Sequence, residues 1–252
     1  MVTAYDEPGA RLADAAGVDL LLVGDSVANV VLGQPDTLRV SVEEMAHHVR
    51  AVAAARPAAH IVADLPWLSY HVGEADAVRN AATLIRAGAH SVKLEGGRRR
   101  EAVVRAIIDA EIPVMGHLGL TPQSVLAFGG FKVQAKTRAA AAALVEEALV
   151  LQAAGVYAVV VEGVPPVVGT AVTEALDVPT IGIGAGPDTD GQVLVFHDLL
   201  GLSGRTPAKF VRQYADLGRA VTEAIERYAA DVRSGGFPDE SEVYATPPEL
   251  QD

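Results

Sequence analysis

Six successive apolar stretches of the chain, each of strand length, end in an ionisable residue. An ionised side chain at the end of a buried strand costs roughly several kcal/mol unless a partner stabilises it. These residues are therefore candidates for a functional site, together with the neighbouring Ser26 and Lys93. In chain order they are Asp6, Asp25, Asp64, Glu95, His117 and Glu162.

Three of the carboxylates are expected to share one metal ion. Asp25, Asp64 and Glu95 offer hard oxygen donors, and the chain has no cysteine thiolate to compete with them. Oxygen donors of this kind favour a hard cation such as Mg²⁺. A metal held by so few protein ligands keeps open positions at which water or a bidentate substrate can bind.

Polar residues near these acids are expected to bind the substrate. Lys93 and Glu95 are two residues apart on one strand, so their side chains point to the same side. A lysine at this position suits a substrate carboxylate, and Ser26 adds a hydroxyl donor. His117 offers a hydrogen-bond donor or an acid–base group near neutral pH.

Each of these residues also has a purely structural interpretation. Asp6 could cap a helix, because a proline follows it closely. Asp25 and Asp64 could cap turns. Lys93 could form a structural ion pair, and His117 could be a hydrogen-bonded core histidine. Independent caps would not be expected at the end of nearly every strand, so the joint pattern favours a site.

The stretches that carry these residues are expected to be parallel strands that alternate with helices. Several are apolar on consecutive positions, which is typical of strands covered on both faces. Alanine-rich stretches with helical spacing lie between them, such as residues 43–55 and 137–155. The strands are expected at residues 2–6, 20–26, 60–66, 91–96, 113–119, 158–164, 179–186 and 192–198.

Helix starts and stops are also marked. Ser41 and Glu44 have capping-box spacing, and Thr206 followed by Pro207 is expected to start a late helix. A repeated Ala-Gly ending is expected to stop three helices, because only glycine takes the left-handed conformation without steric cost. The glycines concerned are Gly17, Gly88 and Gly155.

Eight strand–helix repeats of roughly 30 residues predict an α/β fold, a single (β/α)8 TIM barrel. This catalytic domain is expected to span residues 1–231, and residues 232–252 to form a polar C-terminal tail. Chemistry in such a barrel gathers at the carboxyl ends of the strands, so the candidate residues would meet at one mouth. A doubly wound open sheet is the alternative. It would usually have fewer strands and would carry a phosphate fingerprint after the first one.

The composition excludes several classes of partner. A formal net charge of −12 repels phosphate backbones, which argues against nucleic acid. No apolar stretch reaches the roughly 18–20 residues that span a bilayer, and the N-terminus lacks the pattern of a signal peptide, so no membrane partner is expected. The absence of cysteine fits a reducing, cytoplasmic setting.

Two further stretches keep two interpretations. GIGAGPDTDG at residues 182–191 resembles a phosphate-holding loop without the GxGxxG spacing, and a tight turn explains it equally well. Residues 118–131 are long and apolar for a loop between strand and helix. They could roof the mouth of the barrel or contact a neighbouring subunit.

Seven motifs occur in an order that resembles the 3-methyl-2-oxobutanoate (ketopantoate) hydroxymethyltransferase family, from residue 3 to about residue 240. The most specific are GHLGLTPQSV at residues 116–125 and IGIGAGPDTDGQ at residues 181–192. The others are TAYD at 3–6, LLVGDS at 21–26, VADLP at 62–66, VKLEGG at 92–97 and GGFKVQ at 129–134.

The resemblance implies a barrel of the phosphoenolpyruvate/pyruvate type and the first committed step of pantothenate, hence coenzyme A, biosynthesis. In that step a hydroxymethyl group moves from 5,10-methylenetetrahydrofolate to 3-methyl-2-oxobutanoate, through a Mg²⁺-stabilised enolate, and gives 2-dehydropantoate. The resemblance also implies a homo-oligomer, commonly a decamer.

Roles for individual residues follow from the same resemblance. Glu162 would be the catalytic base. The metal ligands would be Asp25, Asp64 and, through water, Glu95. The residues that bind the oxo acid would be Asp25, Ser26, Asp64, Lys93 and His117.

Three features depart from the family pattern. Members usually have a helical extension before the first strand, whereas this chain starts at Met1. Gly163 follows Glu162 where a side chain is common, and Ala135 stands where glycine is expected after the KVQ element.

Two other functions fit parts of the pattern. A lyase or mutase of the phosphoenolpyruvate mutase and isocitrate lyase type would share the barrel, Mg²⁺ and the chelation of a 2-oxo acid. Those enzymes typically use a cysteine-containing loop or a more basic phosphonate pocket, and this chain has no cysteine. An inactive barrel acting as a scaffold or a small-molecule sensor is disfavoured, because the candidate residues are all chemically competent.

Overall fold

The structure is a computed structural model that describes residues 1–204, 206–247 and 249. Eight parallel strands form one curled sheet, and each strand pairs with the next one in the sequence. The predicted α/β fold with eight parallel strands is therefore confirmed. The strands are β1 (Val2–Thr3), β2 (Leu20–Val23), β3 (His60–Asp64), β4 (Ser91–Glu95), β5 (Val114–Gly119), β6 (Ala158–Glu162), β7 (Thr180–Ile183) and β8 (Gly191–Gln192).

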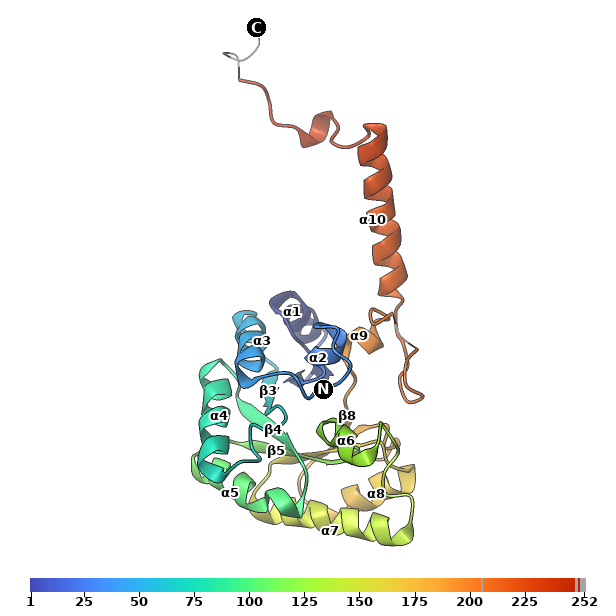
Figure 1. Cartoon of the computed structure of the whole chain (residues 1–252). Coiled ribbons are helices and arrows are strands. Elements are labelled where there is room, and N and C mark those ends of the chain that lie inside the picture. Colours follow the sequence, from blue (N-terminus) through green and yellow to red (C-terminus); the bar gives the residue numbers. More distant parts are fainter. Residues whose placement is uncertain (205, 248, 250–252) are drawn as a thin grey trace. The chain divides into compact units, whose positions relative to one another are not determined.

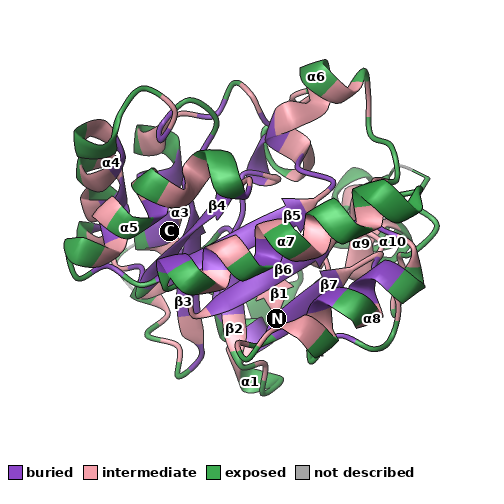
Figure 2. Cartoon of the chain, turned by 90° about the horizontal axis from the view of Figure 1, so that it is seen from below, coloured by how far each residue is buried: buried purple, intermediate pink, exposed green. Residues whose placement is uncertain are grey.

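Helices connect the first seven strands and lie on the outside of the sheet, where their outer faces are exposed (Figures 1 and 2). The main ones are α1 (Glu7–Ala15), α3 (Val42–Ala54), α4 (Glu74–Arg86), α5 (Glu101–Asp109), α7 (Arg138–Ala154) and α8 (Pro166–Ala175). Short helical segments follow the ends of three strands: α2 (Val27–Val30), η1 (Arg98–Arg100), η2 (Pro122–Ser124) and α6 (Val125–Phe128).

Between β7 and β8 the chain forms a tight turn, so the expected alternation of strand and helix is wrong here. Gly184 and Gly186 have φ values of 61° and 93°, in the left-handed region that a helix cannot use. Asp190 Oδ2 accepts hydrogen bonds from the Thr180 backbone N–H at 2.8 Å and from the Thr180 hydroxyl at 3.0 Å. The glycine-rich stretch 182–191 thus has the geometry of the tight turn, the second of its two interpretations.

The eighth strand is shorter than the expected range of residues 192–198. After β8 the chain still makes single backbone hydrogen bonds to both neighbouring strands. Val193 N–H donates to Gly182 O in β7 at 2.9 Å, and Thr3 N–H in β1 donates to Leu194 O at 3.2 Å. Val2 and Leu194 form an isolated parallel bridge. Helix α9 (Phe196–Leu199) then begins inside the range expected for the strand.

Alternate residues of the strands face two apolar clusters. In β6, Val159 and Val161 belong to the large cluster that also includes the inner faces of the helices. Ala158 and Val160 point the other way, into a smaller cluster enclosed by the strands. This alternation leaves inward positions near the carboxyl end of each strand available for polar residues.

Local signals placed most helix ends correctly. Ser41 Oγ accepts a hydrogen bond from Glu44 N–H at 3.2 Å, and Glu44 Oε2 accepts one from Ser41 N–H at 2.7 Å, which confirms the capping box. Gly17, Gly88 and Gly155 all have positive φ, as expected for left-handed residues that end helices. The helix start expected at Thr206 and Pro207 is wrong, because residues 206–208 are not helical.

The chain divides into two compact units. One comprises Met1–Phe196 and Pro207–Val211 and holds the whole sheet. The other comprises His197–Thr206 and Arg212–Asp252, with helices α10 (Leu217–Ser234) and η3 (Glu240–Glu242). The boundary expected between residues 231 and 232 falls inside α10, whose N-cap is Asp216. No helix in the described ranges is long and apolar enough to cross a membrane.

Candidate active site

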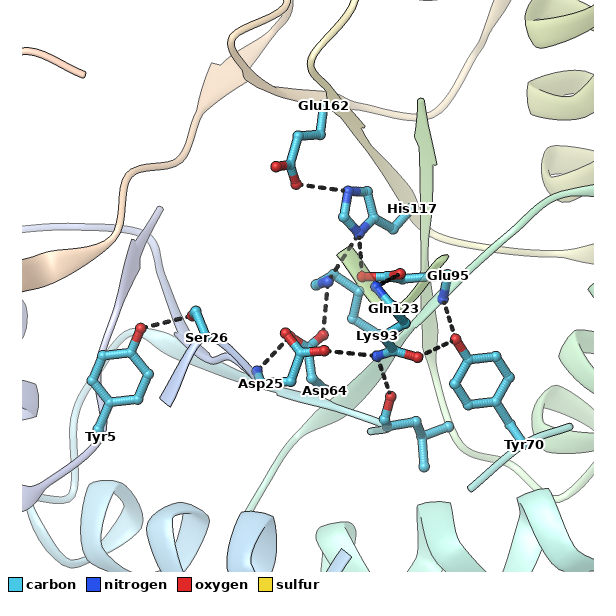
Figure 3. A network of polar contacts seen from close by, with 11 residues as sticks. Tyr5, Asp25, Ser26, Asp64, Tyr70, Lys93, Glu95, His117, Gln123 and Glu162 are labelled. Carbon is cyan, nitrogen blue, oxygen red and sulfur yellow. Dashed lines mark hydrogen bonds and ion pairs between the residues drawn. The ribbon is translucent and has the colours of Figure 1, made fainter. Parts of the chain in front are cut away.

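A cavity of about 100 Å³ lies at the carboxyl ends of the strands. Six of the seven residues predicted for the site line it, although they come from five different strands. Glu95 lies beside the cavity, with Oε1 3.4 Å from His117 Nδ1 (Figure 3). The polar lining is Thr3, Asp25, Ser26, Asp64, Lys93, His117 and Glu162, and the apolar lining is Leu22, Pro122, Val160, Ile183, Val193 and Val195.

Lys93 is the cation at the centre of this group. Its Nζ lies 2.8 Å from Asp64 Oδ1 and 3.2 Å from His117 Nδ1. Burial alone lowers the pKa of Lys93, but the carboxylates of Asp64, Glu95 and Asp25 outweigh burial and raise this pKa. The ammonium group has three N–H donors, so one remains for a ligand in the cavity.

The site holds more negative than positive charge. Asp25, Asp64 and Glu95 are all buried, and Asp25 N–H donates to Asp64 Oδ2 at 3.0 Å. Burial, followed by the charges of Asp64 and Glu95, raises the pKa of Asp25. Burial likewise raises the pKa of Glu95 to about 8, against the opposing effect of Lys93. One ammonium group cannot neutralise three carboxylates, so a further cation would stabilise their ionised forms.

The contacts of His117 determine its tautomer. Lysine can only donate hydrogen bonds, so Nδ1 must accept from Lys93 and the ring proton must be on Nε2. Burial, followed by the charge of Lys93, lowers the pKa of His117 and favours this neutral form. Nε2 lies 3.1 Å from Glu162 Oε2 but, among the described residues, has no well-directed hydrogen bond. It is a donor available to Glu162 or to a ligand.

Glu162 ends β6, and its side chain is 15% exposed at the cavity. The chain turns sharply directly after it, because Gly163 has a φ of 57°. A Cβ at Gly163 would lie 2.9 Å from the Cβ of Leu120, so a side chain there would press on the loop after β5. The glycine that departs from the family pattern therefore has a structural reason in this chain.

Three residues that support the site were not predicted from the sequence. Tyr5 shares a hydrogen bond of 2.8 Å between its hydroxyl and Ser26 Oγ. Gln123 bonds to Asp25 and Glu95, and Tyr70 bonds to Gln123. Tyr5 and Gln123 lie within the motifs TAYD and GHLGLTPQSV, but only their long-range contacts reveal a role.

Asp6 is not part of the site. Its Oδ1 accepts a hydrogen bond from Gly9 N–H at 2.7 Å and caps helix α1. The structural interpretation of this residue is therefore correct.

The family model described as ketopantoate hydroxymethyltransferase matches residues 1–240 of the chain. The chain belongs to this family. It is 54% identical over 251 residues to 3-methyl-2-oxobutanoate hydroxymethyltransferase 2 of Bradyrhizobium diazoefficiens, covering 100% of this chain and 86% of that protein. It is 55% identical over 245 residues to the 3-methyl-2-oxobutanoate hydroxymethyltransferase of Moorella thermoacetica, covering 97% of this chain and 91% of that protein. The predicted family and enzyme class, a hydroxymethyltransferase, are thereby confirmed.

Solved structures resemble this family member in fold. The phosphoenolpyruvate phosphomutase of Streptomyces platensis aligns with a TM-score of 0.60 at 18% identity, over 93% of this chain and 82% of that one. A phosphonopyruvate hydrolase in complex with oxalate and Mg²⁺ aligns with a TM-score of 0.60 at 16% identity, over 96% of this chain and 87% of that one. At such identities the likeness concerns the fold alone.

The donor set fits the divalent cation expected for the family, with few protein ligands. Among the described residues, no group of three His, Cys, Asp or Glu side chains is arranged to hold a metal by itself. Asp25 and Asp64 are neighbours and line the cavity, whereas Glu95 is not in its lining and keeps a buried oxygen, Oε1, without a hydrogen bond in the described part of the chain. Two direct carboxylate ligands with water and substrate in the other positions suit Mg²⁺, which keeps several waters.

Proposed function

We propose that this chain transfers a hydroxymethyl group from 5,10-methylenetetrahydrofolate to 3-methyl-2-oxobutanoate and forms 2-dehydropantoate. The family match over residues 1–240 carries the proposal. Relatives that are 54% and 55% identical to this chain support it, because their names state this acceptor. The reaction would be the first committed step of pantothenate biosynthesis.

The cavity suits a small branched 2-oxo acid. Lys93 has an N–H donor to spare, and the Ser26 hydroxyl, held by Tyr5, faces the same space. Both can bind the carboxylate of the acid. Leu22, Val160 and Ile183 offer an apolar wall for its isopropyl group.

Mg²⁺ is the proposed cofactor, with Asp25 and Asp64 as direct ligands and Glu95 acting through water. When bound, the ion would polarise the keto group of the acid and stabilise the negative charge that develops on it. The raised pKa values of Asp25 and Glu95 support a cation at this position, because its charge would relieve the repulsion among the acids.

Glu162 is the proposed base. It would take the proton from the carbon next to the keto group, and that carbon would then attack the one-carbon unit of the folate. Water would complete the hydroxymethyl group as tetrahydrofolate leaves. His117, with its proton on Nε2 and 3.1 Å from Glu162 Oε2, would orient the carboxylate towards the acid.

Further features belong to the same proposal. We propose that the sheet is a complete (β/α)8 barrel, which the parallel bridge between Val2 and Leu194 supports. The barrel domain over residues 1–231, the tail over 232–252, a homo-oligomer such as a decamer, and a cytoplasmic location remain predictions from the sequence and the family.

The test is an assay of the purified chain with both substrates. We expect 2-dehydropantoate to form only when 3-methyl-2-oxobutanoate, methylenetetrahydrofolate and Mg²⁺ are all present, and to stop when EDTA removes the ion. Formation of no product, or turnover of the oxo acid without the folate, would contradict the proposal.

A further inference from the structure

We propose that Gln123 is a positioning residue, which holds the carboxylates of Asp25 and Glu95 in place for the divalent ion. The proposal rests on the function proposed above and concerns a residue outside the cavity lining. Gln123 lies in η2, in the segment after β5, and is only 5% exposed.

Gln123 connects the ends of three neighbouring strands (Figure 3). Its side-chain Nε2 donates to Asp25 Oδ2 at 2.8 Å, just after β2, and to Leu65 O at 3.0 Å, just after β3. Its backbone N–H donates to Glu95 Oε2 at 2.9 Å, at the end of β4. One residue thus binds both carboxylates, and it does so through two independent groups.

The orientation of the Gln123 amide follows from its partners. The Leu65 carbonyl can only accept, so the group that faces it must be the NH₂. At the other end, Glu95 N–H donates to the Tyr70 hydroxyl at 3.2 Å. The proton of Tyr70 is therefore free to go to Gln123 Oε1, which is 2.6 Å away. Backbone groups at both ends of this network thereby set the direction of every hydrogen bond.

This arrangement occupies one oxygen of each carboxylate and leaves the other for a ligand. Gln123 holds Oδ2 of Asp25 and Oε2 of Glu95. Oε1 of Glu95 is buried beside His117 Nδ1, at 3.4 Å, but that nitrogen accepts from Lys93 and has no proton to donate, so Oε1 makes no hydrogen bond within the described ranges. A buried acceptor without a partner is costly, so we infer that a ligand such as metal-bound water completes it.

A neutral amide suits this position better than a charged side chain. A lysine would cancel part of the negative charge that attracts a divalent ion. A glutamate would place a fourth carboxylate against Asp25 and offer no N–H to it. Glutamine supplies two donors and leaves the charge of the site unchanged.

The test is the variant Gln123→Met, which keeps the length of the side chain and the backbone N–H but removes the amide. Mn²⁺ is the probe, titrated in the absence of both substrates and followed by the EPR signal of the free ion. We expect the Kd for Mn²⁺ to rise at least about tenfold. The Mn²⁺ concentration that half-activates the enzyme should rise similarly, and kcat at saturating Mn²⁺ should fall less.

Two further variants complete the experiment. Tyr70→Phe keeps Gln123 but removes the hydroxyl that orients it, and we expect the Kd for Mn²⁺ to rise about threefold or more. Gln134→Met makes the same chemical change in the same segment, where Nε2 donates to the Lys132 carbonyl at 2.7 Å and, in the part of the chain that the structure describes, bonds to no site residue. We expect this control to bind Mn²⁺ as the unmodified chain does.

The outcomes separate this proposal from the proposed function. A lower Tm of Gln123→Met with an unchanged Kd for Mn²⁺ would overturn the positioning role. If Gln123→Met does not fold, an unchanged Kd in Tyr70→Phe would overturn it. If the unmodified chain binds no Mn²⁺ or Mg²⁺, the metal part of the proposed function is wrong and the role of Gln123 falls with it.

Discussion

Lys93 makes direct contacts with both Asp64 and His117, and each contact has a different consequence. The contact with Asp64 neutralises one buried acid. The contact with His117 places the histidine proton on the side that faces Glu162. A single buried ammonium group thus offsets part of the charge of the carboxylates and directs the histidine proton towards Glu162.

At the residue scale, Glu162→Gln tests the proposed base. The amide has the same shape but cannot accept the proton, so we expect kcat to fall by about 10²–10⁴-fold, the range for loss of a general base. Lys93 and Ser26 are unchanged, and the Kd for 3-methyl-2-oxobutanoate should stay within about threefold. Turnover and calorimetric titration of the oxo acid measure the two quantities. Glu174→Gln, on the exposed side of α8, is the matched control, and an equal loss of kcat there would contradict the assignment.

A second residue, His71, gives a prediction on stability. Burial, followed by the charge of Arg100, lowers the pKa of His71 to about 4. The unfolded chain binds this proton near pH 6.5, so folding stability falls as the pH drops from about 6.5 to 4. We expect the fall in Tm between pH 7 and pH 5 to be smaller in His71→Asn by roughly 1–3 °C, since a half-exposed group contributes little.

The raised pKa of Glu95 acts in the opposite direction, because the folded state binds that proton more tightly and gains stability as the pH falls below about 8. This effect is common to both proteins and cancels in the comparison. If the two Tm curves remain parallel from pH 7 to pH 5, His71 does not carry the effect.

At the scale of elements, the segment between β5 and α7 holds only the short helical pieces η2 and α6 among its described residues. It begins with η2, which contributes Gln123, continues through α6, and returns to the sheet where Gln134 N–H bonds to Gly163 O at 2.8 Å. Leu126 and Phe131 are exposed in it. Near its start Gln123 bonds to Asp25, and near its end Gln134 bonds to the residue after Glu162. The shape of this segment and the geometry of the site therefore depend on each other.

Ala135 in this segment has a φ of 53°, in the left-handed region. This is the position at which the family pattern has glycine, and a Cβ there costs about 1–2 kcal/mol. Ala135→Gly should remove this strain, but glycine also raises the entropy of the unfolded chain, which offsets part of the gain. We expect a net increase in stability of up to about 1 kcal/mol and in Tm of about 2–4 °C. Thermal unfolding of the variant and the unmodified chain measures this change in Tm. Ala142→Gly, on the exposed face of α7, should instead lower stability by about 1 kcal/mol. A loss of stability in both variants would show that Ala135 is not strained.

At the scale of the whole molecule, the sheet brings residues from Asp25 to Glu162 to a cavity of about 100 Å³. Each strand contributes little, but eight parallel strands in sequence order direct all their carboxyl ends to one side. Repulsion among the acids then lowers the stability of the entire fold, and a bound cation would reduce this repulsion.

Ion binding should therefore stabilise the whole sheet unit. A ligand at about 100 times its Kd adds about 2.7 kcal/mol, so saturating Mg²⁺ should raise Tm by roughly 5–10 °C. EDTA should reverse the shift, and KCl at equal ionic strength should not reproduce it. In Asp25→Asn the shift should be several-fold smaller. An equal shift in that variant would place the stabilising ion elsewhere.

Most of the strands and the identity of the candidate residues could be read from the sequence. Strands covered on both faces are apolar along their length, so an ionisable residue at the end of six of them stood out, and Asp25, Asp64 and Glu162 became candidates in this way. Glycine endings and the Ser41 capping box depend on neighbouring residues only, and they too were predicted correctly. These features are determined by residues that are close in the sequence, which is why the sequence alone was enough to predict them.

Other properties depend on how distant strands are displaced against one another. The bonds of Gln123 to Asp25 and Glu95 cross 98 and 28 residues, and no local pattern announces them. The same holds for the tautomer of His117, which depends on Lys93 across 24 residues. A hydrogen bond requires its atoms within about 3 Å and in the right direction. Only the packed sheet sets distances that finely, and so it alone determined which of the acids are neighbours and which residues hold them.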